Sequence, residues 1–77
     1  MTSFNLFRMD CYTMDGSVKV NRTVYLNPES VISIERASAI TTVRTTGLDY
    51  YLDAKPEHIM EGLKNVQERN NILLMLN

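Results

Sequence analysis

The chain has 77 residues, of which eight are Lys or Arg and nine are Asp or Glu, so its formal net charge is −1. A chain of this length is expected to form a single domain, residues 1–77. It lacks the dense positive charge with which a strongly basic protein neutralises nucleic-acid phosphates. No apolar run approaches the roughly 20 residues needed to span a bilayer, so we expect a soluble protein without a membrane partner.

The numbers of cysteine and histidine residues limit the disulfides and metal sites that the chain can form. Cys11 is the single cysteine and His58 the single histidine, which excludes an intramolecular disulfide and a zinc site of the Cys/His type. We therefore expect neither a metal nor another cofactor, and a lone cysteine without a signal peptide favours the cytoplasm. A domain this small buries only about 60% of the surface that its unfolded chain exposes, so oligomerisation is the remaining source of added stability.

The first 26 residues predict a β-hairpin. Alternate residues of the first run fall on one face: Phe7, Met9 and Cys11. Asp15-Gly16 predicts a type I′ turn, because both central residues of that turn need positive φ. The returning run, residues 17–26, has an apolar face that Arg22 interrupts. We expect Arg22 to lie at a sheet edge or to reach water, with an anion contact as the alternative.

Residues 31–52, VISIERASAITTVRTTGLDYYL, predict three consecutive antiparallel strands. The runs are 31–36, 40–45 and 48–52, divided by Ala37-Ser38-Ala39 and by Thr46-Gly47. Their period of two predicts four core residues: Ile32, Ile34, Val43 and Leu52. The threonines are expected to form a solvated strand face: Thr41, Thr42, Thr45 and Thr46.

From Pro56 the apolar period becomes helical. Proline suits a first-turn position and Glu57 complements the helix dipole, so we expect a helix over 56–70 that ends near Asn70-Asn71. Three residues are expected to pack on the sheet: Ile59, Leu63 and Val66. Gly62 costs about 1 kcal/mol relative to alanine within a helix, which indicates close packing against the sheet.

Five consecutive apolar residues follow: Ile72, Leu73, Leu74, Met75 and Leu76. They cannot all face one side of a helix or strand, and chain ends are normally polar unless they are docked. We expect this apolar tail, residues 72–76, to be an oligomer interface that docks on a second copy. The alternatives are that it folds back on its own domain or inserts into a different partner.

Together these segments predict an α+β domain. Residues 1–52 form an antiparallel meander of about five strands, as a bent sheet or a small open barrel, and one C-terminal helix closes one side.

The candidate binding residues are arginines and tyrosines on this sheet: Arg22, Arg36, Arg44, Tyr50 and Tyr51. Arg36 and Arg44 flank a short turn, which could bring both to one ligand, while adjacent tyrosines point to opposite faces and leave one for recognition. No nucleophile, base and orienting group can be assembled, so we expect no enzyme. We predict a non-enzymatic binding or regulatory module that acts as a homo-oligomer and recognises a protein partner. The alternatives are a nucleic-acid-binding regulator and an oligomeric binder of a small anionic ligand.

The segment from Val24 to Leu63 has an ordered set of motifs: VYLNPESVISIE, a variable turn, TTVRTTGLDYYL and PEHIMEGL. This order resembles the small flagellar-operon proteins of the FlbD type, which have a strand ending in an Asn-centred turn, an I-x-x-I-E strand, a T-x-G hairpin and a terminal helix. It is also similar to the second half of LytTR-type DNA-binding domains, although the basic residues that this family uses on DNA are missing. The resemblance implies a sheet followed by a helix and assigns no functional residue.

Overall fold

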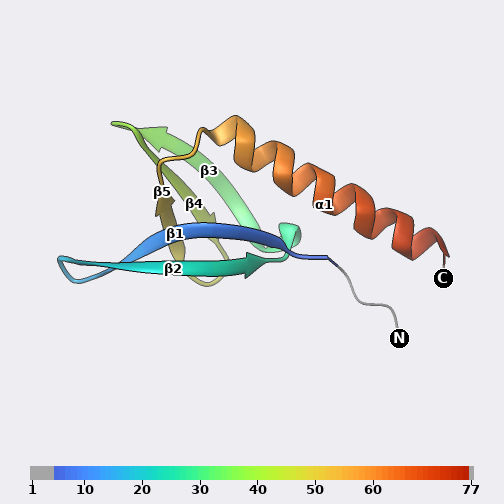
Figure 1. The fold of residues 1–77 in the computed structure, drawn as a ribbon, viewed down its shortest axis with the longest axis horizontal. Coiled ribbons are helices and arrows are strands. Elements are labelled where there is room, and N and C mark those ends of the chain that lie inside the picture. Colours follow the sequence, from blue (N-terminus) through green and yellow to red (C-terminus); the bar gives the residue numbers. More distant parts are fainter. Residues whose placement is uncertain (1–4, 77) are drawn as a thin grey trace.

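Five strands and one long helix account for most of residues 5–76, the part of the chain that the computed structural model describes. The elements are β1 (Phe7–Asp15), β2 (Val18–Leu26), the 3-10 turn η1 (Pro28–Ser30), β3 (Val31–Ala37), β4 (Ile40–Thr45), β5 (Asp49–Leu52) and α1 (Pro56–Leu76). The strands form one open antiparallel sheet, so the predicted α+β class with a C-terminal helix is confirmed (Figure 1).

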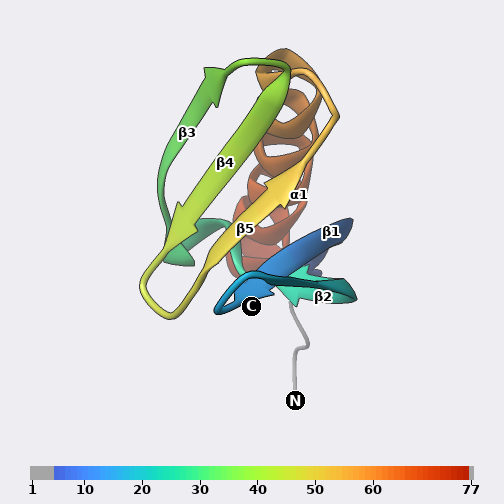
Figure 2. The same ribbon diagram turned by 90° about the vertical axis from the view of Figure 1, so that its left-hand side faces the viewer.

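The sheet has the strand order β2-β1-β5-β4-β3 and therefore consists of two local units. β1 and β2 form a hairpin, and β3, β4 and β5 form a meander. Among the described residues, β1 pairs with β5 at one position, Tyr12 with Tyr51. Figure 2 shows that the hairpin turns away from the meander beyond this junction, and that α1 lies behind both. The sheet is thus strongly bent where β1 meets β5.

The turn of the first hairpin lies one residue later than predicted. Asp15 pairs with Val18, so the two turn residues are Gly16 and Ser17 rather than Asp15 and Gly16. Gly16 has φ 63° and Ser17 is not among the positive-φ residues, a pattern that fits a type II′ turn. Positive φ at both turn positions occurs instead between β3 and β4, where Ser38 has φ 50° and Ala39 φ 64°.

A β-bulge in β3 changes the predicted core. Val31 pairs with Thr45 and Ser33 with Arg44, so Ile32 has no partner of its own on β4. The extra residue reverses the alternation of the strand, and the side chain of Ile32 is 64% exposed. The prediction that Ile32 lies in the core is therefore wrong, whereas Ile34 packs against the core and is half-buried.

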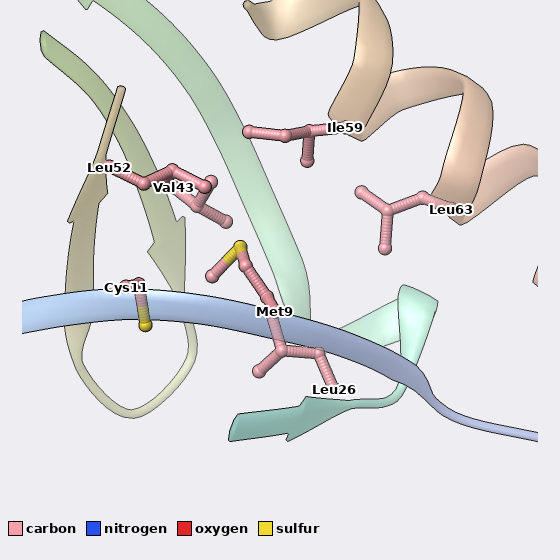
Figure 3. Packing of buried hydrophobic residues seen from close by; sticks show 7 residues of the cluster. All are labelled: Met9, Cys11, Leu26, Val43, Leu52, Ile59 and Leu63. Atoms are coloured by element: carbon pink, nitrogen blue, oxygen red, sulfur yellow. The ribbon is translucent and has the colours of Figure 1, made fainter. Parts of the chain in front are cut away.

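The core lies between the inner face of the bent sheet and α1. Its buried residues come from the hairpin, the meander and the helix: Met9, Cys11, Leu26, Val43, Leu52, Ile59 and Leu63. Figure 3 shows Ile59 and Leu63 pointing from α1 toward Met9 of β1 and Val43 of β4. Val66 is also buried, so the predicted core positions on β4, β5 and α1 are confirmed.

The helix continues to Leu76, so the predicted end near Asn70 and the separate tail are wrong. The Asn70 side chain is buried and spans two backbone groups of the N-terminal segment. Its Oδ1 accepts a hydrogen bond from Asn5 N at 2.9 Å, and its Nδ2 donates to Asn5 O at 3.1 Å. Asn71 Oδ1 accepts from Gln67 Nε2 one turn earlier at 3.2 Å. Both asparagines thus have side-chain partners that are compatible with a continuing helix.

The close packing predicted at Gly62 is confirmed, and its partner is Phe7. A Cβ atom placed on Gly62 would lie 3.2 Å from Cδ1 and Cζ of Phe7 and closer still to Cε1. The absence of a side chain at Gly62 lets the aromatic ring of β1 lie directly against the helix.

Replacing Leu63 by alanine should lower the free energy of unfolding by about 2–5 kcal/mol, since a buried side chain is lost from the core. The matched control is Ile32→Ala, which removes an exposed side chain and should change stability by no more than about 0.5 kcal/mol. Urea denaturation of both variants checks the contrast. Equal losses would show that the bulge does not displace Ile32 from the core.

Gly62→Ala should destabilise the protein by about 1–3 kcal/mol, because the added methyl group overlaps the ring of Phe7. Helix propensity alone would change stability in the opposite direction by about 1 kcal/mol. A double-mutant cycle with Phe7→Leu, followed by urea denaturation, isolates the contact. A Gly62→Ala variant that is more stable than the parent would contradict the packing.

Candidate functional site

The outer face of the sheet, opposite α1, carries a row of side chains that crosses all five strands. Residues that pair directly across neighbouring strands share one face. From β2 to β3 the paired residues are Asn21, Tyr12, Tyr51, Thr42 and Glu35. The centre of this row is the junction of the hairpin with the meander.

Two stacked tyrosines and a lysine occupy that centre. The rings of Tyr12 and Tyr51 have centroids 5.5 Å apart and planes inclined by 30°. Lys19 Nζ lies 4.1 Å from the centroid of the Tyr12 ring. An aromatic pair contributes about 0.5–1.5 kcal/mol beyond its buried area, and an exposed cation–π contact about 0.5–1 kcal/mol. These contacts connect β2, β1 and β5 on the outer face and leave both rings half-exposed.

A shallow hollow beside the tyrosine pair is open to solvent rather than enclosed. Its polar lining carries both signs of charge: Asp10, Lys19, Asn21, Arg22, Thr23 and Asp53. Small-molecule sites are mostly apolar clefts that surround their ligand. The geometry of this hollow is therefore suited to part of a larger partner's surface.

Tyr51, but not Tyr12, was identified from the sequence. Tyr50 and Tyr51 point to opposite faces as predicted: Tyr50 packs against the core, and Tyr51 lies on the outer face. Tyr12 was missed because its partner is distant in the sequence. The signal was available in the alternation of β1, which buries Met9 and Cys11 and so places Tyr12 on the opposite side.

Arg36 has structural partners. Its Nη1 donates to Thr41 Oγ1 at 2.8 Å, to Asp53 O at 3.0 Å and to Ala54 O at 3.2 Å. Thr41 Oγ1 in turn donates to Ala54 O at 2.6 Å. This network attaches the β3–β4 hairpin to the connection that leads into α1, so Arg36 has a structural role, and its contact with a ligand stays a prediction.

The other two arginines lie apart from Arg36. Arg36 pairs with the buried Thr41 on the inner face, whereas Arg44 lies on the outer face, where its Nε is 3.5 Å from Asp49 Oδ1. The two cannot reach one ligand, which corrects the prediction. Arg22 lies on the edge strand β2, as predicted, and its Nε donates to Thr13 Oγ1 at 2.7 Å. No arginine cluster forms in the described sheet, and neither alternative function gains a geometric basis.

Two threonines of β4 also depart from the prediction. Thr41 and Thr45 are buried on the inner face with Val43, whereas Thr42 lies on the outer face. Burial is possible because both hydroxyl groups are bonded. Thr45 Oγ1 donates to Leu48 O at 2.7 Å and accepts from the backbone N–H groups of Gly47 and Leu48, each at 3.1 Å. The solvated face predicted for Thr41 and Thr45 is therefore wrong.

The last turns of α1 form a second candidate surface, which we call the α1 end. Its exposed side chains are Ile72 (56%), Leu74 (61%), Met75 (84%) and Leu76 (78%), while Leu73 is half-buried. Figure 1 shows that this part of the helix projects beyond the strands. The expectation that one chain leaves part of residues 72–76 in water is confirmed.

The described residues offer few other reactive or ligand-binding groups. Burial raises the pKa of the Cys11 thiol, Asp10 raises it further, and Arg22 acts in the opposite direction. His58 is exposed in the first turn of α1. Within residues 5–76, no group of three His, Cys, Asp or Glu side chains is placed to hold a metal ion. No described helix has the length and apolarity needed to cross a membrane.

Comparison with known proteins assigns no function to this site. No protein family, curated protein or solved structure matches this chain. The resemblance to FlbD-type and LytTR-type proteins therefore stays a prediction.

The raised pKa of Cys11 predicts a loss of stability in alkaline solution. The folded state disfavours the thiolate, so burial of the neutral thiol costs no stability below the pKa of the unfolded thiol, about 8.5. The stability that depends on this neutral thiol is fully present in that range. It is lost as pH rises from there through the higher folded value. The free energy of unfolding, measured from pH 7 to 10, should fall more steeply for the parent than for Cys11→Ala. Parallel curves would contradict the burial of a neutral thiol.

Proposed function

We propose that this chain is a non-enzymatic binding module that forms a homo-oligomer through the α1 end and recognises a protein partner through its exposed sheet. The observation that carries the proposal is the exposure of the four apolar side chains of the α1 end. Complete burial of one such side chain is worth about 1.5–3 kcal/mol. Covering several of them can therefore offset much of the cost of association.

The distribution of these side chains favours a second copy as the cover. They lie on different sides of the helix, and a helix that is apolar all round is normally buried all round. The upstream turn is polar on its exposed side, with Glu68 and Arg69, so the contact is confined to the α1 end. The sheet of the same chain does not extend over this part of the helix (Figure 1). Because folded chains associate and unfolded chains do not, association also stabilises the folded state of a small domain.

A protein partner is supported by the character of the outer face. The stacked Tyr12 and Tyr51 leave aromatic area exposed, and Tyr25 is exposed on β2. Tyrosine is enriched at the energetic centres of protein interfaces. The regulatory role predicted from the sequence is part of this proposal.

The state of Cys11 is in keeping with the non-enzymatic role and the cytoplasmic location that we propose. A thiol acts as a nucleophile in its thiolate form, which burial disfavours at this site. Cys11 is also the single cysteine of the sequence and a buried free thiol, which fits a reducing compartment.

Sedimentation equilibrium at micromolar concentration tests the self-association. The full chain should be oligomeric, whereas a chain that ends at Asn71 and the double variant Met75→Glu/Leu76→Glu should be monomeric. Met60→Glu is the matched control, since Met60 is 57% exposed on the same helix but far from the α1 end. Its assembly should equal that of the parent.

Two results would refute the self-association. One is a monomeric full chain at micromolar concentration. The other is a truncated or doubly substituted chain that keeps the assembly of the parent.

A further inference from the structure

We propose that the free edge of β2 binds an extended segment of a partner protein, which joins the sheet as a sixth strand. The segment carries a carboxylate between two apolar residues, in the pattern apolar-x-acidic-x-apolar. This inference rests on the protein-binding part of the proposed function and specifies its surface and the chemistry of its partner. It does not depend on the α1 end.

The edge of β2 is long and regular. β2 is the outermost strand of the sheet, and all nine of its residues pair with β1 without a register shift. It contains no proline, and no described backbone group bonds to its other side. Such an edge presents a row of unpaired N–H and C=O groups that a further strand can use.

The register identifies which backbone groups face outward. In a hairpin closed by a two-residue turn, the closing pair, here Asp15 with Val18, is hydrogen-bonded, and hydrogen-bonded pairs alternate with open pairs along the ladder. The residues of β2 in open pairs therefore direct their N–H and C=O groups to the free edge: Lys19, Asn21, Thr23 and Tyr25. The residues between them bond to β1.

The opposite edge of the sheet is blunted. β3 is shorter, and the bulge at Ile32 interrupts its ladder with β4. β3 also contacts α1 along this side of the molecule. Bulges and short strands usually protect a sheet edge against further pairing. The β3 edge is therefore protected, whereas the β2 edge is open to an added strand.

The charge of β2 selects the partner. β2 carries Lys19 and Arg22 and has no acidic residue. A second β2 strand paired at this edge would bring cations together without a carboxylate, which disfavours self-pairing. Arg22 lies on the inner face between Val20 and Val24, which are half-buried. An incoming strand that matches this order places a carboxylate opposite Arg22 and an apolar side chain opposite each valine.

The guanidinium group of Arg22 is held toward β1. Its Nε is fixed by the hydrogen bond to Thr13 Oγ1 at 2.7 Å, so the position of the group is set by β1. A guanidinium group has further N–H donors besides Nε, and these can bind a carboxylate. The structural interaction that holds Arg22 is thus compatible with its use in binding.

Synthetic nine-residue peptides of alternating threonine and valine test the proposal, with glutamate, valine or lysine at the central position. The glutamate peptide should bind about tenfold more tightly than the lysine peptide, with the valine peptide between them. Binding is measured by NMR titration of the amide groups. The outward amides of Lys19, Asn21, Thr23 and Tyr25 should gain protection from hydrogen exchange, whereas those of Val20, Arg22 and Val24 should change little.

Variants separate backbone pairing from charge. Arg22→Glu should reverse the preference, so that the lysine peptide binds more tightly than the glutamate peptide. Asn21→Pro removes an outward N–H group without removing a β1–β2 hydrogen bond, and it should abolish binding if the fold is kept. A glutamate peptide whose alternate threonines are N-methylated should not bind to the parent and requires no change in the protein.

Binding that is independent of the central residue, or protection at β3 instead of β2, would overturn the proposal. Concentration-dependent protection of the same four amides without peptide would assign the edge to a second copy and also overturn it. Each titration is repeated with the Met75→Glu/Leu76→Glu variant. A monomeric variant that binds the peptide would show that edge pairing does not need self-association. A chain that assembles but does not bind the peptide would refute the edge pairing and leave the self-association standing.

Discussion

The packing of α1 against both halves of the bent sheet is the interaction on which the rest of the structure depends. The hairpin and the meander share one described backbone pair, so the ladder contributes little to holding them together. The core instead combines Met9, Cys11 and Leu26 of the hairpin with Val43 and Leu52 of the meander, and Ile59 and Leu63 of the helix contact this combined set. Phe7 adds a contact at Gly62 that no larger residue would permit. The bend therefore persists because one helix covers both units.

The local sequence pattern predicts the strands and the helix. It fails where one extra residue changes the alternation of a strand, and where a buried polar side chain bonds to a distant part of the chain. Period and turn residues predict five strands, the start of α1 and most of its buried stripe. The bulge at Ile32 carries no sequence signal, and one extra residue reverses the faces of β3. Thr41 and Asn70 look like surface residues because their partners, Ala54 and Asn5, lie elsewhere in the chain. Strand order and the Tyr12–Tyr51 pair are likewise long-range properties that no local window contains.

The candidate surfaces differ in how far the sequence identified them. The apolar residues 72–76 are conspicuous because they are consecutive, and their exposure follows from the length of the helix. The three arginines are similar in sequence but have three different settings: Arg36 supports the fold, Arg44 pairs with Asp49, and Arg22 lies at a free edge. Residue type alone could not separate them, since their roles depend on register and strand order. The molecule thus presents an apolar helix end and a cationic strand edge as separate surfaces.

The sparse junction between β1 and β5 also has a consequence for the order of folding. The hairpin and the meander form from contacts between near neighbours in the chain, whereas Tyr12 and Tyr51 meet only after the intervening residues have been closed into a loop. Closing a long loop costs entropy before its contacts are made, so contacts of long sequence separation form slowly. We therefore expect the two units to become ordered first and the helix to capture them together, with the tyrosine pair completing the folded state.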